Sequence, residues 1–230
     1  MPRRTITPLA LALTVTALAV ATVATTPARA DGPAPAYWRL VEVEHQLAQW
    51  AAAHPDLVHV DTLGTTGQGA TIPLVRISDN VAVREREPAL FLHGAQHANE
   101  GNGTGAVMAM MARLLDGHGV DPAITARVDG LELWFAPIVN VDGHLHVFSS
   151  GTPHWADWRK TLRDNNGNHQ VDFPGDGVDP NRNWDWRWEQ SDETDPASQK
   201  YKGPFPFSES EVRALRDFIL RERPAVVVDY

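Results

Sequence analysis

The sequence predicts an α/β domain whose sheet is mixed but mainly parallel and is covered by helices on both faces. Segments with the spacing of amphipathic helices alternate with short apolar segments, an order typical of such sheets. Residues 131–139 are apolar at nearly every position, as strands buried on both faces are. With 230 residues, of which 43% are hydrophobic, the chain is long enough to bury one sizeable core.

The first part of this domain is predicted to contain one helix and one hairpin. Apolar residues at spacings of three and four predict a helix over residues 38–54, which Pro55 ends. Residues 57–63 and 71–77 have the composition of strands. The glycine-rich residues 64–69 between them predict the hairpin turn.

The middle of the chain is predicted to hold the centre of the sheet. A strand at residues 89–93 leads to a helix over residues 105–115. The buried strand at residues 131–139 then ends in Asn140-Val-Asp-Gly143, whose residue types indicate a turn.

The last part begins with an irregular segment, roughly residues 146–206, and a segment of that length is usually functional in a compact domain. Ser208 and Glu211 have the spacing of a capping box and predict a helix to about Arg223. A short strand over residues 225–228 follows.

Residues 1–30 have the composition of a secretory signal peptide. Arg3 and Arg4 precede an apolar stretch over residues 9–23, and Ala28-Arg-Ala30 fits a cleavage site. We therefore expect cleavage near Ala30, a secreted protein, and a domain over residues 31–230. The apolar stretch is too short to span a bilayer and no other stretch is long enough, so no membrane span is expected.

The charge and the cysteine count exclude several classes of function. The formal net charge is −9, and removal of Arg3, Arg4 and Arg29 with the signal peptide leaves 17 basic against 29 acidic residues, a charge of −12. So acidic a chain is not expected to bind nucleic acid. The absence of cysteine excludes disulfides and thiolate ligands, so histidines and carboxylates must supply any metal site.

His97 and Glu100 follow the predicted strand at residues 89–93 and lie three positions apart. A helical turn would place both side chains on one side, where an imidazole and a carboxylate suit a zinc ion. The same pair is also compatible with a simple hydrogen-bonded loop, so the interpretation depends on the motifs that accompany it.

Four motifs occur in a fixed order along the chain: His97-x-x-Glu100, Asn140-Val-Asp-Gly143, Trp158-Arg-Lys160 and Gly177-Val-Asp-Pro-Asn-Arg-Asn-Trp184. Together they resemble the zinc metallocarboxypeptidases of the funnelin type, the family of carboxypeptidases A and B and bacterial carboxypeptidase T. The resemblance extends from about Trp38 to Tyr230. It implies a zinc carboxypeptidase-like α/β/α fold, a zinc cofactor, and a peptide or protein substrate with a free C-terminus; we expect a monomer.

The resemblance also implies roles for individual residues. His97 and Glu100 are expected to be zinc ligands, and Arg159 to polarise the scissile carbonyl and stabilise its oxyanion. Asn181 and Arg182 are expected to bind the terminal carboxylate of the substrate. This agrees with the chemistry of these side chains, because a guanidinium matches a carboxylate through two parallel hydrogen bonds.

The family's third zinc ligand is a histidine at the close of the strand that corresponds to residues 225–230, and its general-base glutamate lies further along. This chain ends at Tyr230, where that histidine would come. A catalytic zinc ion takes three protein ligands and a water. We therefore expect an incomplete catalytic domain that is weakly active or inactive.

Alternatives remain open at this point. A relative of the same fold could hydrolyse peptidoglycan stem peptides or deacylate amino acids, and a non-catalytic module could bind peptide C-termini. Arg159 could be a surface charge, and residues 181–182 could belong to a structural ion-pair loop with Asp179 and Asp185. Trp184, Trp186 and Trp188 either line a pocket or pack beneath the long loop.

A calcium ion is a possible second cofactor. Residues 164–172 place oxygen-bearing side chains at every other position, with Asp176 beyond them. This spacing is compatible with a calcium site, although it lacks the glycine and the final glutamate of an EF-hand loop. The alternative is a turn-rich solvated loop.

Overall fold

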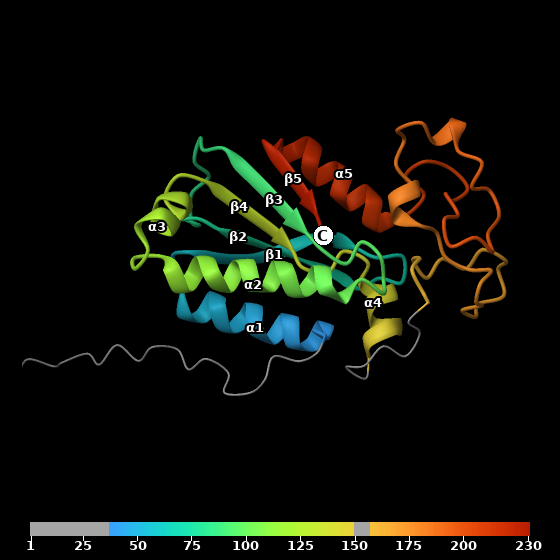
Figure 1. Ribbon diagram of the computed structural model, residues 1–230, viewed down its shortest axis with the longest axis horizontal. Coiled ribbons are helices and arrows are strands. Elements are labelled where there is room, and N and C mark those ends of the chain that lie inside the picture. The colour runs from blue at the N-terminus through green and yellow to red at the C-terminus, as the bar shows by residue number, and fades with distance from the viewer. Residues whose placement is uncertain (1–36, 150–156) are drawn as a thin grey trace, which may run out of the picture. The chain divides into compact units, whose positions relative to one another are not determined.

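Residues 37–149 and 157–230, which the computed structural model describes, form a sheet with covering helices (Figure 1). The predicted signal peptide lies outside the described residues. In chain order the elements are α1 (Leu40–Ala53), β1 (Val58–Thr65), β2 (Thr71–Ile77), β3 (Ala89–His93), α2 (Gly101–Gly117), α3 (Pro122–Val128), β4 (Glu132–Ala136), α4 (Val141–Phe148), the 3-10 helices η1 (Pro180–Arg182) and η2 (Trp188–Gln190), α5 (Ser210–Glu222) and β5 (Val226–Asp229).

The sheet has the strand order β1-β2-β4-β3-β5. Strand β2 is antiparallel to both of its neighbours, whereas β3 is parallel to β4 and to β5. All strands other than β2 therefore run in one direction. The predicted mixed, mainly parallel sheet is confirmed.

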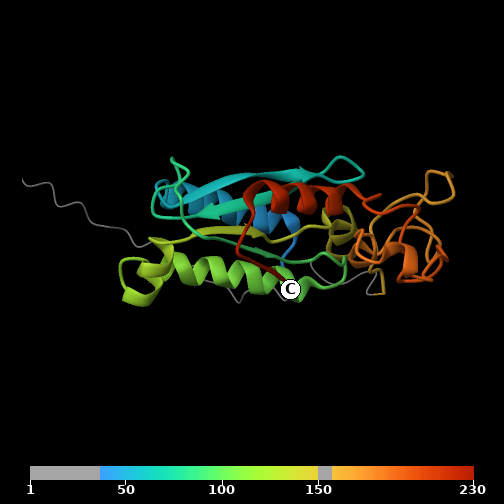
Figure 2. The same ribbon diagram turned by 90° about the horizontal axis from the view of Figure 1, so that it is seen from above.

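Helices cover both faces of this sheet. Helix α2 and helix α5 lie on opposite sides of it, as the turned view shows (Figure 2). Helix α2 packs against β3 and β4, and α5 packs against β1. On the α5 side, the ring of Phe218 lies with its centroid 4.5 Å from that of Phe91 and 5.3 Å from that of Trp134. The predicted covering of both faces is confirmed.

The structure differs from the prediction at several helix boundaries. Helix α2 begins at Gly101 rather than residue 105, and helix α3 was not predicted. The predicted turn at residues 140–143 is the start of helix α4, because the side chain of Asn140 accepts a hydrogen bond from the amide of Gly143 and caps the helix.

The capping box predicted at the start of α5 is also wrong. Glu209, not Ser208, occupies the N-cap position and makes no side-chain cap. The hydroxyl of Ser208 instead donates to the Glu209 carboxylate and accepts from Asn183. These tertiary contacts use the groups that a capping box would need.

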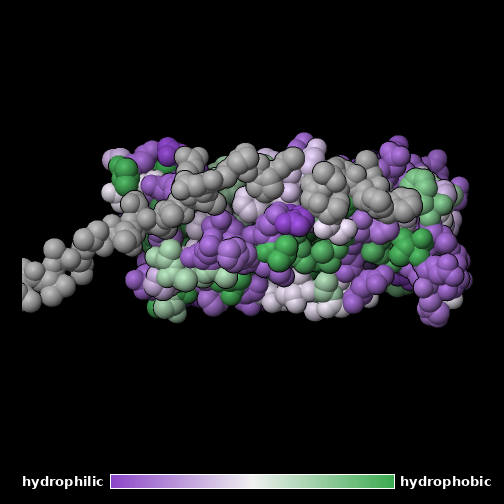
Figure 3. All heavy atoms as spheres, turned by 90° about the horizontal axis from the view of Figure 1, so that it is seen from below, coloured by the Kyte–Doolittle hydropathy of each residue, from purple (hydrophilic) through white to green (hydrophobic). Residues whose placement is uncertain are grey.

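Hydrophobic residues on the face shown in Figure 3 form separate patches between hydrophilic ones. Scattered apolar side chains of this kind are usual on protein surfaces. Within the described ranges, none of the helices has the length and apolar character that crossing a bilayer requires.

Two buried carboxylates, Asp142 and Glu211, contact the tip of the β1–β2 hairpin, and the charge of a third, Glu209, acts on Glu211. Glu209, Glu211 and Asp142 are each at most 6% exposed. Asp142 accepts a hydrogen bond from the amide of Gln68 at 2.9 Å, and Glu211 accepts one from the amide of Gly67 at 3.5 Å. Burial, together with the charges of Glu209 and Asp142, raises the pKa of Glu211 to about 7 from its ordinary value of 4.5.

This raised pKa makes the stability depend on pH. Between pH 4.5 and about 7 the folded chain binds more protons at Glu211 than the unfolded chain does, so the free energy of unfolding falls as pH rises through this range. Replacing Glu211 with Gln removes the charge but keeps an oxygen acceptor. We expect Glu211→Gln to raise the free energy of unfolding by about 2–3 kcal/mol at about pH 8 and to change it little near pH 4.

Urea unfolding at the two pH values measures this difference. Glu44→Gln is the matched control, because Glu44 is an exposed glutamate on α1. If the free energy of unfolding of Glu211→Gln depended on pH as strongly as that of the parent chain, the raised pKa of Glu211 would be contradicted.

Candidate functional site

The turn that carries His97 and Glu100 is fixed by two close backbone approaches. Beyond β3, a Cβ atom on Gly94 would lie 2.7 Å from the backbone of Gly103 in α2, so only glycine fits there. The amide of Ala98 donates to the carbonyl of Arg159 at 3.0 Å. The chain then closes a turn in which the amide of Glu100 donates to the carbonyl of His97. This turn precedes α2, so His97 and Glu100 lie outside the helix, and the turn itself places their side chains next to each other.

The imidazole of His97 lies between two carboxylates. Its Nδ1 is 2.9 Å from Oε2 of Glu100, and its Nε2 is 3.0 Å from Oδ1 of Asp179. His97 is 5% exposed and Asp179 is fully buried. Burial alone would lower the pKa of His97, but the hydrogen bonds to Asp179 and Glu100 outweigh it and raise that pKa.

Arg159 closes the group into a ring of four side chains. Its Nε donates to Oδ2 of Asp179 at 3.1 Å, and its Nη1 donates to Oε1 of Glu100 at 3.2 Å. Burial would raise the pKa of Asp179, but the hydrogen bond from His97 and the charge of Arg159 lower it. The predicted residues His97, Glu100 and Arg159 therefore lie together, and Arg159 is not an isolated surface charge.

Asp179 was not predicted as a site residue. From the sequence, Asp179 was expected only as a flank of a possible ion-pair loop, whereas in the structure it binds both His97 and Arg159. Its Oδ1 also accepts from the amide of Asn181 and caps η1, which begins at Pro180. An Asp directly before a Pro is a typical helix start, and this was the local signal available in the sequence.

Asn181 and Arg182 lie beside this ring, at the wall of a cavity of about 460 Å³. The cavity is also lined by Gln96, which precedes His97, but His97, Glu100 and Arg159 do not line it. Within the described ranges, the guanidinium of Arg182 has one hydrogen bond, to the carbonyl of Asn181, and no carboxylate partner. This contradicts a structural ion-pair loop for Arg182.

Residues of the second and third motifs fix the backbone next to Arg159, one of the four side chains of the ring. Asn140 donates from Nδ2 to the carbonyl of Lys160 at 3.0 Å, and the indole of Trp158 donates to the same carbonyl. Lys160 is 1% exposed and donates to the carbonyls of Pro174 and Pro196. Burial lowers the pKa of Lys160 to about 8. These contacts hold the backbone at Arg159 in place.

The loop over residues 164–176 does not support a calcium site. The carboxylate of Asp164 accepts hydrogen bonds from the amides of residues 166, 167 and 169. Asp172 accepts from the side chains of Asn166 and Asn168, and Asp176 from the amides of residues 165 and 172. The carboxylate oxygens thus bind the loop's own N–H groups, as in a turn-rich solvated loop.

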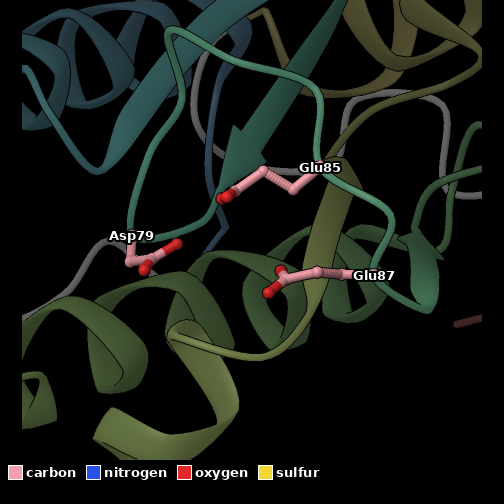
Figure 4. Close-up of side chains that lie close together, drawn as sticks. All are labelled: Asp79, Glu85 and Glu87. Carbon is pink, nitrogen blue, oxygen red and sulfur yellow. The ribbon is translucent and has the colours of Figure 1, made fainter.

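A separate acidic cluster lies before β3. The carboxylates of Asp79, Glu85 and Glu87 point toward one another (Figure 4), with their oxygens within 4.8 Å. Burial and the charges of Glu85 and Asp79 raise the pKa of Glu87. These residues precede the strand that His97 follows, so they belong to the opposite end of β3.

The fold and the ring define an α/β domain with a polar site at the carboxyl ends of its parallel strands, the usual position of sites in such sheets. A family model described as zinc carboxypeptidase matches residues 43–230. The chain therefore belongs to the zinc carboxypeptidase family. The predicted resemblance is confirmed.

Individual relatives agree with the family model. Over 185 residues the chain is 32% identical to carboxypeptidase A2 of Rattus norvegicus, covering 80% of this chain and 41% of that protein. Over 152 residues it is 32% identical to a zinc carboxypeptidase of Saccharothrix mutabilis subsp. capreolus, covering 66% and 33%. The chain thus spans about two fifths or less of the length of these relatives.

Solved structures share the fold. Carboxypeptidase A from Helicoverpa armigera superposes with a TM-score of 0.72 at 25% identity, covering 84% of this chain and 45% of that one. Thrombin-activatable fibrinolysis inhibitor superposes with a TM-score of 0.70 at 21% identity, covering 84% and 46%.

Removal of the Asp179 side chain tests the ring. Asp179→Ala leaves His97 and Arg159 without their shared buried partner and uncaps η1. We expect the free energy of unfolding to fall by about 3 kcal/mol, the usual effect of breaking a buried ion pair from one side. Chemical denaturation measures the change. Asp185→Ala, an exposed aspartate in the same segment, is the control, and an equal effect of the two substitutions would contradict the role of Asp179.

Proposed function

We propose that this chain is a zinc-dependent metallocarboxypeptidase that hydrolyses peptides at their C-terminus, with His97 and Glu100 as zinc ligands. The observation that carries the proposal is the contact between Nδ1 of His97 and Oε2 of Glu100 at 2.9 Å. An imidazole nitrogen and a carboxylate oxygen, both able to bind a metal ion, thus lie next to each other. Membership of the zinc carboxypeptidase family supports the choice of metal.

The chemistry of the ring fits a zinc ion. When Nε2 of His97 carries the proton and donates to Asp179, the lone pair of Nδ1 is free and faces Glu100. A carboxylate behind a metal-binding histidine fixes its tautomer and increases its basicity as a ligand. Imidazole nitrogen and carboxylate oxygen are both usual zinc ligands.

The other residues have roles that follow from their positions. A bound zinc ion supplies a Lewis acid that activates water and polarises the peptide carbonyl. Arg159, held by Asp179, presents a fixed positive charge beside that point and stabilises the developing oxyanion. Asn181 and Arg182 bind the α-carboxylate of the substrate, because Arg182 is a cation without a carboxylate partner in the described part of the chain.

The same geometry limits the expected activity. Within residues 37–149 and 157–230, His97 and Glu100 are the two ligand groups that meet at this point. A catalytic zinc ion takes three protein ligands. We infer that the 230-residue chain by itself binds zinc weakly and turns over slowly.

We also infer that the protein is exported. The support is the sequence of residues 1–30, with Arg3 and Arg4 before an apolar stretch and Ala28-Arg-Ala30 at its end. N-terminal sequencing of protein recovered outside the cell tests this inference, which requires the mature chain to begin close to Asp31.

Zinc affinity tests the proposed metal site. We expect His97→Ala to weaken zinc binding more than Asp179→Asn does, because the first removes a ligand and the second only its support, which is typically worth about 10–100-fold in affinity. Competition with a chromophoric chelator measures both constants. His118→Ala, which removes a histidine that pairs with Asp129 away from the ring, should leave the affinity unchanged. Equal affinity in all variants would overturn the site.

The substrate class is tested with one peptide prepared with a free or an amidated C-terminus. We expect zinc-dependent release of the last residue from the free acid alone, and Arg182→Gln should abolish the distinction. Binding of the free acid that needs no zinc and produces no cleavage would favour a peptide-binding module instead.

A further inference from the structure

A small hydrophobic core, separate from the main one, lies beside the ring. Its residues are each at most 2% exposed: Ala98, Val147, Phe148 and Trp158. Ala98 directly follows His97, and Trp158 directly precedes Arg159. Tyr37, which precedes α1, is partly buried and packs against this small core. The small core is therefore joined through the backbone to two of the four ring residues.

The ring of Tyr37 contacts both α4 and the start of α2. Its centroid lies 5.1 Å from that of Phe148 in α4. A Cβ atom on Gly101 would lie 2.8 Å from Cδ1 of Tyr37 and 2.9 Å from Cζ of Phe148, so the two rings leave room only for glycine. Gly101 begins α2 and directly follows Glu100. Tyr37 thus packs against the backbone next to one of the two proposed zinc ligands.

A buried histidine holds the backbone beside Tyr37. Nε2 of His144 donates to the carbonyl of Trp38 at 2.8 Å, and the His144 side chain is fully buried. Burial lowers the pKa of His144, so the imidazole is neutral at about pH 7 and its Nε2 carries the proton. Helix α1 begins at Leu40, two residues after Trp38. Residues 37–39 are therefore fixed by α4 on one side and by α1 on the other.

Close packing connects α4 to the residues next to the ring. A Cβ atom on Gly143 would lie 2.7 Å from Cβ of Ala98, so α4 lies directly against Ala98. The amide of Ala98 in turn donates to the carbonyl of Arg159. Protein interiors are close-packed, and the neighbours of a removed side chain move only in part to fill its space. Loss of the Tyr37 ring is therefore expected to loosen the small core and the turn from His97 to Glu100.

We propose that Tyr37 is a positioning residue for the metal site: by closing the small core, it holds the turn from His97 to Glu100 in the geometry that binds zinc. The proposal rests on the proposed function, in which His97 and Glu100 are the zinc ligands. Tyr37 acts through the backbone of Ala98 and Gly101 and not as a ligand. Ligands that are not held in place by their surroundings bind a metal ion less tightly.

Zinc affinity of the full chain, measured by competition with a chromophoric chelator, tests this proposal. We expect Tyr37→Ala to weaken zinc binding about tenfold, the lower end of the effect of residues that support metal ligands. Tyr37→Phe keeps the aromatic ring and should bind zinc as the parent chain does. If Tyr37→Ala does not fold, Tyr37→Leu, which removes less of the packing, takes its place.

Val43→Ala is the matched control, because Val43 is fully buried on α1 but belongs to the main core. It should lower the free energy of unfolding, measured with urea, and leave the zinc affinity unchanged. Two results would overturn the role of Tyr37 and leave the zinc site intact: parent-like affinity in Tyr37→Ala, or an equal loss of affinity in Val43→Ala. A parent chain that does not bind zinc would overturn the proposed function together with this inference.

Discussion

The site depends on one buried carboxylate. Asp179 is fully buried and binds a ring nitrogen of His97 with one oxygen and Nε of Arg159 with the other. A buried charge is tolerated only when its partners satisfy it, so the three side chains fix one another. The same carboxylate caps η1 and thereby positions Asn181 and Arg182. The positions of His97 and Arg159 relative to Asn181 and Arg182 thus follow from one interaction.

The long segment that carries Asp179 is ordered without strands or α-helices in its described residues, 157–209. Hydrogen bonds from buried polar side chains take the place of the backbone–backbone hydrogen bonds that strands and α-helices make. Lys160 donates to two carbonyls, and Lys202 donates to the carbonyls of Trp188 and Ser191. Asn183 is fully buried and contacts the carbonyls of residues 202 and 205. Each of these donors joins positions at least ten residues apart, so side-chain hydrogen bonds connect the parts of this segment to one another.

Much of the fold could be predicted because it depends on local pattern. Continuous apolar runs identified β3 and β4, and the spacing of apolar residues identified α1. The residue types of 105–115 identified most of α2, and the spacing of Ser208 and Glu211 identified α5. Helix α4 was missed because Asn140 has the residue type of a turn as well as that of a helix cap, and only the tertiary contacts choose between them. The capping box at Ser208 failed for a related reason, since its hydroxyl binds the side chains of Asn183 and Glu209 instead.

The sequence by itself determined the class of sheet and the family, because local pattern and the order of the motifs encode both. It also predicted that His97 lies near Glu100, from their three-residue separation. The tertiary structure alone decided that Asp179 joins His97 to Arg159 across 82 and 20 positions. It also decided that Trp184, Trp186 and Trp188 line a cavity with Arg182, and that Trp184 packs against the main core as well. Such pairings depend on how the long segment folds back on the sheet, and no local periodicity encodes the path of an irregular chain.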